Sequence, residues 1–339
     1  MTKLNDINIL AIESSCDDTS AAVYTNEIIK SNITASQLDH SLYGGVVPEV
    51  ASRQHDIHIT MVVDEALKKA DITTSELSAV AVTKGPGLIG SLHVGVSFAK
   101  GLALSLGIPI IAVHHMHAHI LSHFIDEPKP KFPFLCLTVS GGHTQIVRVD
   151  SYKDMTILGE TIDDAAGEAF DKSGKILGLP YPAGPIIDKN AHLGMAKYKF
   201  AKPHVAGYNF SFSGFKTSVL YFIQDRIKED ANFVKANLND ICASIQEGII
   251  QILIEKLSQA INDTGIKSVA IAGGVSANKG LRNQLAEQAE QNGWELFIPD
   301  FQYCTDNAGM IGMAAYFKYL DGKFDSQVLS AEPRWPFIH

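Results

Sequence analysis

Two stretches of the sequence, one in each half of the chain, share the same order of features and constrain the fold most. Residues 7–25 run from an apolar segment (INILAIE) through a polar turn into a second apolar segment, and residues 134–150 do the same around SGGH. Short apolar runs that end in polar turns are typical of buried strands. We expect residues 21–32 to form one returning strand. The repetition predicts two related lobes, each with a phosphate-facing hairpin over a shared cleft.

A second constraint comes from the histidines, because five of the thirteen fall within residues 114–123. An apolar strand precedes them, and a helix is expected to follow. Positions four apart lie on one helix face, which pairs His119 with either His115 or His123. His115 and His123 would lie about 12 Å apart along the axis, too far to share one ion with bonds of about 2.1 Å. The pattern therefore predicts two metal ligands and a distant third, or a solvated histidine-rich face.

The length and composition fit a folded chain of about two domains, with 339 residues, 46% of them apolar. A net charge of −9 argues against a broadly basic nucleic-acid binder. Four cysteines without CxxC spacing predict a reduced, intracellular protein. No uncharged run reaches the roughly 20 residues of a membrane helix, and the first apolar run is too short for a signal peptide. We therefore expect a cytoplasmic protein that does not associate with membranes.

Polar turns at the ends of expected strands are the other candidate sites. The turn of residues 14–20 carries carboxylates and hydroxyls, which suit a phosphate or its metal but also a plain solvated hairpin. Gly141 and Gly142 lack the Cβ that would block a ligand from the backbone N–H groups. Residues 273–278 deliver two glycines and an asparagine to a helix start, which favours a nucleoside or phosphate cradle. Asp306 begins another helix, as its cap or as the third metal ligand.

The segment of residues 197–216 mixes basic with aromatic side chains. Single-stranded RNA is recognised by such mixtures, although loop packing produces them equally often. The lysines that we consider candidates for contact with RNA are Lys197, Lys199, Lys202 and Lys216.

Nine sequence blocks, in one order and spanning nearly the whole chain, carry a resemblance to a known family. They are ESSCDDTSAAV (13–23), GGVVPEVASRQH (44–55), KGPGLIGSLHVG (84–95), HHMHAH (114–119), VSGGHTQ (139–145), DDAAGEAFDK (163–172), FSFSGFKT (210–217), GGVSANKGLR (273–282) and CTDNAGMI (304–311). With these blocks the chain closely resembles the bacterial branch of the tRNA N6-adenosine threonylcarbamoyltransferase (TsaD-like) family, formerly described as an O-sialoglycoprotein endopeptidase.

The resemblance implies an α/β, two-lobed actin/Hsp70-like (ASKHA) fold with a duplicated mixed-sheet domain and an interlobe cleft. We expect residues 1–112, completed by 321–339, to form the N-terminal lobe, and residues 113–320 to form the C-terminal lobe with the metal and nucleotide sites. The implied reaction transfers the threonylcarbamoyl group from L-threonylcarbamoyladenylate to N6 of adenosine 37, in tRNAs reading codons that begin with A, and releases AMP. The implied partners are tRNA, a paralogous TsaB-like subunit and a TsaE-like ATPase.

The resemblance also implies the site residues. One divalent metal, Fe²⁺ in the first place with Zn²⁺ as the alternative, would be held by His115, His119 and Asp306. The acyl-adenylate would lie against Thr138, Val139, Ser140, Gly141, Gly142, Asp171, Gly184, Asp188 and Asn278. We add Glu13 and Asp17 from the first turn as candidates for handling the N6 proton.

Two departures and two alternatives accompany this interpretation. Ala183 occupies a position that is usually glycine in the family, so a positive φ there would strain its methyl group. His117 and Ala118 replace a frequent Glu-Gly pair, off the face of His115 and His119. The spacer between those histidines holds no glutamate, which argues against an HExxH peptidase.

An ATP-dependent kinase or ATPase of the same fold, and a non-catalytic interaction subunit, are the alternatives.

Overall fold

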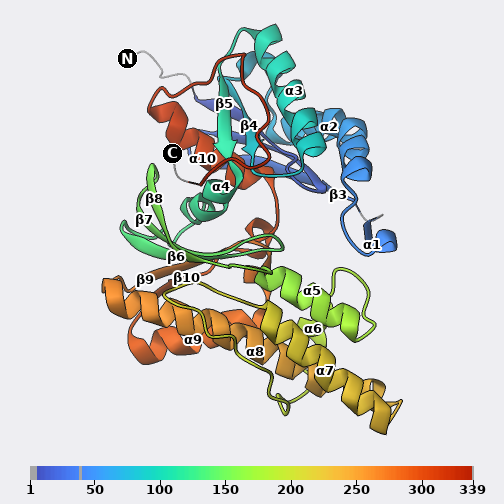
Figure 1. Cartoon of the computed structure of the whole chain (residues 1–339). Helices are drawn as coiled ribbons and strands as arrows, with labels where there is room; N and C mark the ends of the chain where they lie inside the picture. The colour runs from blue at the N-terminus through green and yellow to red at the C-terminus, as the bar shows by residue number, and fades with distance from the viewer. Residues whose placement is uncertain (1–5, 38–39, 338–339) are drawn as a thin grey trace. The chain divides into compact units, whose positions relative to one another are not determined.

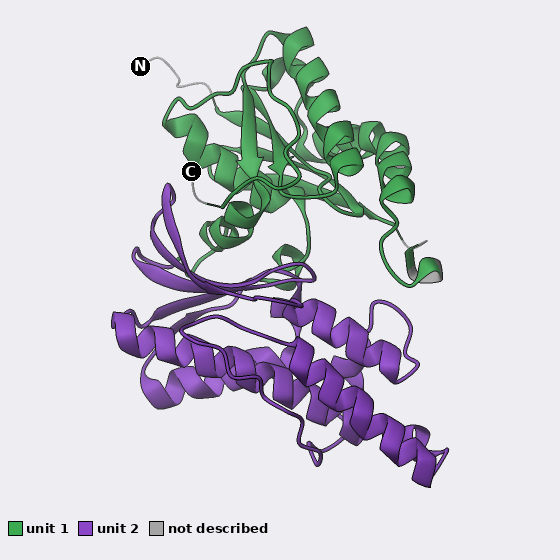
Figure 2. Cartoon of the chain, viewed as in Figure 1, with its two compact units in different colours: residues 1–129, 300–339 green, residues 130–299 purple. Residues whose placement is uncertain are grey.

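The computed structural model describes residues 6–37 and 40–337, and the chain divides into two compact units (Figure 1, Figure 2). Unit 1 contains residues 1–129 and 300–339, and unit 2 contains residues 130–299. These bounds differ from the predicted ones, because segments 113–129 and 300–320 belong to unit 1. The reason is local: the helix of residues 115–121 follows its strand without a break, and the helix of residues 308–320 packs on the strands of unit 1.

Unit 1 is built on a five-stranded mixed sheet of order β3-β2-β1-β4-β5. Its strands are β1 (Asn8–Glu13), β2 (Asp18–Thr25), β3 (Ile28–Ser36), β4 (Ala79–Gly85) and β5 (Ile110–His114). Its helices are α1 (His40–Tyr43), α2 (Pro48–Ala70), α3 (Ile89–Leu106), α4 (His115–Leu121) and α10 (Ala308–Leu320), with short 3-10 turns η1 (Thr74–Glu76), η2 (Ser122–Phe124) and η4 (Phe301–Tyr303). β1 pairs antiparallel with β2 and parallel with β4.

Both faces of the central strand β1 are covered, and all of its residues are buried. On one face, Leu10 and Ile12 share a buried cluster with residues of α2 and α3. On the other face, the hydroxyl of Tyr24 donates a hydrogen bond of 2.8 Å to the carbonyl of Gly309 in α10. The sheet therefore fixes α10, and the segment just before it, against strands nearly 300 residues away in sequence.

Unit 2 repeats the same plan in residues 130–299. Its strands are β6 (Phe134–Val139), β7 (Thr144–Ser151), β8 (Asp154–Glu160), β9 (Ser268–Ala272) and β10 (Glu295–Phe297), and its helices are α5 (Ala166–Ile176), α6 (Gly184–Ala191), α7 (Ser213–Glu229), α8 (Phe233–Thr264) and α9 (Lys279–Asn292), with η3 (Gly274–Ala277). The order β8-β7-β6-β9-β10 matches β3-β2-β1-β4-β5 strand for strand. In both sheets the first three strands are antiparallel and the last two parallel. The predicted α/β class with a duplicated mixed sheet is confirmed.

One detail of the predicted hairpin is wrong, because residues 21–32 form parts of two strands rather than one. β2 begins at Asp18, inside the expected turn, and ends at Thr25. Asn26 then adopts a left-handed conformation with φ 56°, which asparagine tolerates better than most residues. Its side-chain oxygen accepts a hydrogen bond of 3.1 Å from the backbone N–H of Ile7. A tight turn at Asn26 thus adds β3 to the sheet.

Helix α3 is long and apolar enough to cross a membrane by length and composition alone. One such helix is weak support for a membrane span, because the core helix of a globular unit passes the same test. Leu92, Val96 and Ala99 of α3 are buried, and Val96 and Ala99 join the cluster formed with β1 and α2. With 33% of α3 buried, packing within unit 1 accounts for part of its apolar character.

Candidate metal centre and nucleotide pocket

The histidine segment forms the expected strand and helix. All five residues of β5 are buried, and α4 begins directly after it at His115. α4 ends at Leu121 and residues 122–124 continue as a 3-10 turn, so His123 does not extend the helical face of His119. The structure therefore selects the pair of His115 and His119, which spacing alone left open.

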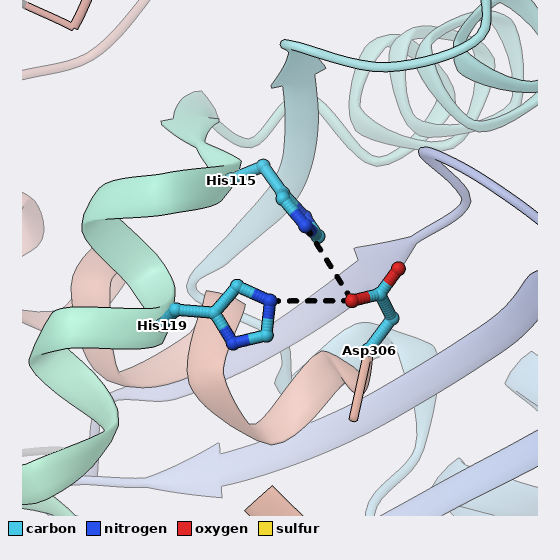
Figure 3. Close-up of side chains that lie close together, drawn as sticks. All are labelled: His115, His119 and Asp306. Atoms are coloured by element: carbon cyan, nitrogen blue, oxygen red, sulfur yellow. Dashed lines mark hydrogen bonds and ion pairs between the residues drawn. The ribbon is translucent and has the colours of Figure 1, made fainter. Parts of the chain in front are cut away.

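Asp306 is far from the two histidines in the sequence but completes their cluster in space (Figure 3). Its Oδ1 lies 3.4 Å from Nε2 of His115 and 3.2 Å from Nε2 of His119. The cap of α10 is Asn307, whose side chain accepts a hydrogen bond from the N–H of Met310. Asp306 is therefore not the N-cap of α10, and its carboxylate faces the two rings.

The donor set fits a divalent metal ion. The ligand atoms of His115, His119 and Asp306 all lie within 4.8 Å of one another. Two ligands bound at about 2.1 Å to one tetrahedral ion lie about 3.4 Å apart, which matches both Asp306 separations. Two imidazoles and one carboxylate suit zinc or ferrous iron. This cluster could hold a metal ion.

Local charge also prepares the site for a cation. Burial opposes a charge on His115, but Asp306 and Glu13 outweigh it and raise the pKa of this ring to about 9. Burial lowers the pKa of His119. The carboxylates thus stabilise a positive charge on the ring of His115, while the neutral ring of His119 keeps a lone pair for a metal.

Of the two proton-handling candidates, one is enclosed and one reaches the surface. The side chain of Glu13 has no exposed area and lies at the end of β1. Asp17 is half-buried in the following turn. Sequence reasoning missed Thr83, whose hydroxyl donates a hydrogen bond of 2.6 Å to Glu13. The parallel pairing of the strands that end at residues 13 and 85 could have suggested this contact.

Unit 2 contains a cavity of about 520 Å³. Five of the predicted substrate-binding residues line it: Gly141, Asp171, Gly184, Asp188 and Asn278. Gly274, Val275 and Ala277 belong to the predicted cradle of residues 273–278. The lining residues that sequence reasoning missed are Gly167, Phe170, Pro182, Pro185, Lys189, His192 and Lys279. Most of them neighbour predicted residues in sequence, so an extension of each motif by a few positions would have found them. The cavity volume lies within the usual range for small-molecule sites.

The other four predicted contacts lie outside the residues that line this cavity. Thr138 and Val139 are fully buried in β6. Ser140 accepts a hydrogen bond of 3.0 Å from the N–H of His143, which closes the β6–β7 turn. Gly142 is exposed in that turn. A direct ligand role for these four residues stays a prediction.

Several lining side chains already hold the backbone of the cavity. Asp171 accepts hydrogen bonds from the N–H groups of Ala183 and Gly184, at 2.8 and 3.2 Å. Asn278 caps α9 through the N–H of Leu281 and donates to Gln246 at 2.8 Å. Burial raises the pKa of the Asp171 carboxyl, although the N–H groups of Ala183 and Gly184 lower it. These residues therefore shape the cavity.

The departure at Ala183 carries no backbone strain, because its φ is −85°. Its methyl group is accommodated by a nearby glycine: a Cβ added at Gly174 would lie 2.1 Å from the Cβ of Ala183. The small residue that the family places in this loop is thus replaced by a complementary pair in α5 and the loop.

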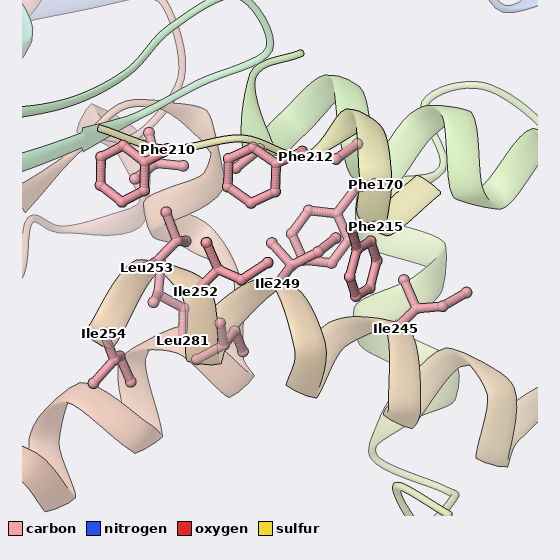
Figure 4. Packing of buried hydrophobic residues seen from close by; sticks show 14 of the residues in the cluster. Phe170, Phe210, Phe212, Phe215, Ile245, Ile249, Ile252, Leu253, Ile254 and Leu281 are labelled. Atoms are coloured by element: carbon pink, nitrogen blue, oxygen red, sulfur yellow. The ribbon is translucent and has the colours of Figure 1, made fainter. Parts of the chain in front are cut away.

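The aromatic side chains of residues 197–216 pack inward (Figure 4). Phe210 and Phe212 belong to the buried core of unit 2 and lie beside α8. Tyr198 and Phe200 pack against the same core, so loop packing explains the aromatic residues better than base stacking does. Three of the four lysines pair with carboxylates of this unit: Lys197 with Asp240, Lys202 with Glu255, and Lys216 with Asp164.

The fold and the site together define an α/β protein of the actin/Hsp70-like class with a candidate metal centre. T. kodakarensis HypF has a similar fold, with a TM-score of 0.63 and 16% identity over 96% of this chain. The match covers 49% of that chain, so this protein spans about half its length.

Comparison of sequences gives the family. Residues 27–313 match the family described as TsaD, tRNA N6-adenosine threonylcarbamoyltransferase. A protein of that name from Christiangramia forsetii is 60% identical over 335 residues, which cover 98% of both chains. Another from Porphyromonas gingivalis is 57% identical over 94% of this chain and 95% of its own. The chain belongs to the tRNA N6-adenosine threonylcarbamoyltransferase family, and it is a transferase of tRNA modification.

Proposed function

We propose that this protein transfers the threonylcarbamoyl group from L-threonylcarbamoyladenylate to N6 of adenosine 37, in tRNAs reading codons that begin with A. In this reaction a bond forms between N6 and the carbamoyl carbon, the bond from that carbon to the phosphate oxygen breaks, and AMP leaves. The observation that carries the proposal is the complete His115, His119 and Asp306 cluster in a member of this family. A non-catalytic subunit would have no use for it.

The metal in this proposal is one divalent ion per subunit, Fe²⁺ in the first place with Zn²⁺ as the alternative. Two histidines and one carboxylate leave open coordination positions. A bound ion would supply Lewis-acid polarisation of the donor. The protein supplies the rest, because transfer from a good leaving group to a weak amine nucleophile depends mainly on positioning.

The donor nucleotide is assigned to the cavity of unit 2. Gly141 lines the cavity next to an exposed turn, and a Cβ at this position would meet nothing within 4 Å. Its backbone is therefore open to a phosphate or carbonyl oxygen. Asn278 and Asp188 would contact the nucleoside part. Asp17, half-buried at the end of the first hairpin turn, is the candidate that accepts the N6 proton.

The partners in this proposal are tRNA, a TsaB-like paralogous subunit and a TsaE-like ATPase, all in the cytoplasm. The net charge of −9 suggests that much of the RNA affinity comes from the partners. Lys197, Lys199 and Lys202 are exposed, and Lys197 and Lys202 each pair with a carboxylate, whereas the described residues give Lys199 no ion pair. Lys199 is the first choice for a direct phosphate contact.

The test is reconstitution with unmodified tRNA, ATP, threonine, bicarbonate, the donor-forming enzyme and the partner subunits. Mass spectrometry of the nucleosides should show adenosine that has gained one threonylcarbamoyl group, and sequencing should place it at position 37. A tRNA whose anticodon reads no codon beginning with A is the control. Phosphorylation of a small substrate or ATP hydrolysis by the chain alone, without the modified nucleoside, would instead favour the kinase or ATPase alternative.

A further inference from the structure

Glu13 is a fully buried carboxylate directly behind the candidate metal centre. It ends β1, and its side chain has no exposed area. Its Oε1 accepts a hydrogen bond of 2.5 Å from the N–H of Ser15, and its Oε2 accepts one of 2.6 Å from the hydroxyl of Thr83. Oε2 also lies 3.1 Å from Nδ1 of His115. Both oxygens of Glu13 therefore have partners inside the protein.

These contacts separate Glu13 from the role of proton acceptor. A general base must come within hydrogen-bond reach of the proton that it removes. Glu13 is held by donors from a turn and from β4, and none of its surface is open to a substrate. Ser15, Thr83 and His115 all lie within hydrogen-bond reach of its two oxygens. A carboxylate that is bonded through both oxygens is suited to hold its neighbours in place.

We propose that Glu13 is a positioning residue, which fixes the ring of His115 so that Nε2 presents its lone pair to a metal. Nδ1 of His115 lies 3.1 Å from Oε2 of Glu13 and 3.1 Å from the hydroxyl of Ser15. With a metal bound beside Asp306, the ring would keep its hydrogen on Nδ1, where Glu13 can accept it, and Nε2 would offer its lone pair to the ion. Histidine ligands of metals are commonly oriented in this way by a carboxylate behind the ring. The inference rests on the metal site of the proposed function.

The second histidine of the cluster lacks this support. Within the part of the chain that the structure describes, Nδ1 of His119 is buried and has no hydrogen-bond partner. His119 is placed by α4 and its packing, with 1% of the residue exposed. The two ligands therefore differ: the orientation of His115 depends on Glu13, whereas that of His119 depends on the helix.

The experiment compares three variants of the full chain by their affinity for Co²⁺, measured by chelator competition, and by the d–d spectrum of the bound ion. Glu13→Gln should weaken binding about 10- to 100-fold and change the spectrum, because an amide cannot accept from all three donors. Thr83→Val removes one donor to Glu13 and should weaken binding less. Thr19→Val is the matched control, since Thr19 is equally buried in the same sheet but contacts His55 at 2.7 Å.

Each outcome of this experiment decides one claim. If the Glu13→Gln and Thr83→Val variants bind Co²⁺ as the wild type does, with an unchanged spectrum, the proposed role of Glu13 is overturned. The metal centre itself would stay in place. A wild type that binds no Co²⁺, Zn²⁺ or Fe²⁺ would overturn the metal centre of the proposed function itself. If Glu13→Gln fails to fold, as judged by circular dichroism, Thr83→Val against Thr19→Val decides the question alone.

Discussion

The two units share one sheet topology but differ at the end of the first strand. β1 of unit 1 ends in the buried charge of Glu13, and β6 of unit 2 ends at the equivalent place in the buried, apolar Val139. Around Glu13, unit 1 gathers His115, His119 and Asp306. Unit 2 has the open glycine turn and a cavity of about 520 Å³. The same scaffold thus supports a candidate metal centre in one unit and a cavity beside an open glycine turn in the other.

The largest expected effect comes from removing one residue of the candidate metal centre in unit 1. His119→Ala removes a ligand that no neighbour can replace, so bound metal and transfer should be lost together. Removal of a group that stabilises developing charge commonly costs about 100-fold or more in rate. The measurement is metal content of the purified protein beside product formation by mass spectrometry.

The control for that variant is His93→Ala, which removes an exposed histidine of α3 and should leave the metal content unchanged. Normal transfer by a metal-free His119→Ala protein would refute a catalytic role for the metal.

A second substitution tests whether the cavity of unit 2 binds the nucleotide independently of the metal centre in unit 1. Gly141→Leu should place its side chain in the cavity without a clash, because a Cβ there meets nothing within 4 Å. We expect AMP to bind at least about 10-fold more weakly, a loss of about 1.4 kcal/mol, with metal content unchanged. Calorimetric titration with AMP measures the loss.

Gly101→Leu, at an equally open glycine in unit 1, is the matched control and should bind AMP as the wild type does. Equal weakening by both variants would contradict the assignment of the nucleotide to this cavity.

The packing that supports the cavity gives a smaller effect. Gly174→Ala should destabilise unit 2 by about 1–3 kcal/mol, because the new methyl group would lie 2.1 Å from that of Ala183. Ala183→Gly in the same chain should restore most of the lost stability. Urea unfolding of the wild type, both single variants and the double variant measures this coupling. Additive effects would show that the two positions do not pack together.

The smallest effect is expected on the surface of unit 2. Lys199→Ala should weaken binding of tRNA by the assembled enzyme about two- to fivefold, because one phosphate contact is lost. Lys197→Ala should have less effect, since Asp240 already pairs with Lys197 at 2.6 Å. Filter binding at two salt concentrations compares the variants. A larger loss for Lys197 than for Lys199 would reverse the proposed order of the lysines.

The sequence was sufficient where local pattern decides structure. The repeated strand–turn–strand unit predicted the duplicated sheet, and the four-residue spacing limited the histidine ligands to two pairs. It was insufficient where distant segments meet. Spacing could neither choose between His115 and His123 nor show that Asn307, rather than Asp306, caps α10. It also could not show that Phe210 and Phe212 face the core, because burial depends on the helix that packs over them.

The discontinuity of unit 1 has a consequence for the order of synthesis. Unit 2 is complete once residue 299 has been made, whereas unit 1 still lacks Asp306 and α10. The insertion of about 170 residues takes roughly 10–30 s to translate at about 5–20 residues per second. Throughout that time β1 and β2 are without the helix that covers one of their faces. Unit 2 can therefore fold on the ribosome first. The cluster of His115, His119 and Asp306, which could bind a metal, is complete only when the last tenth of the chain emerges.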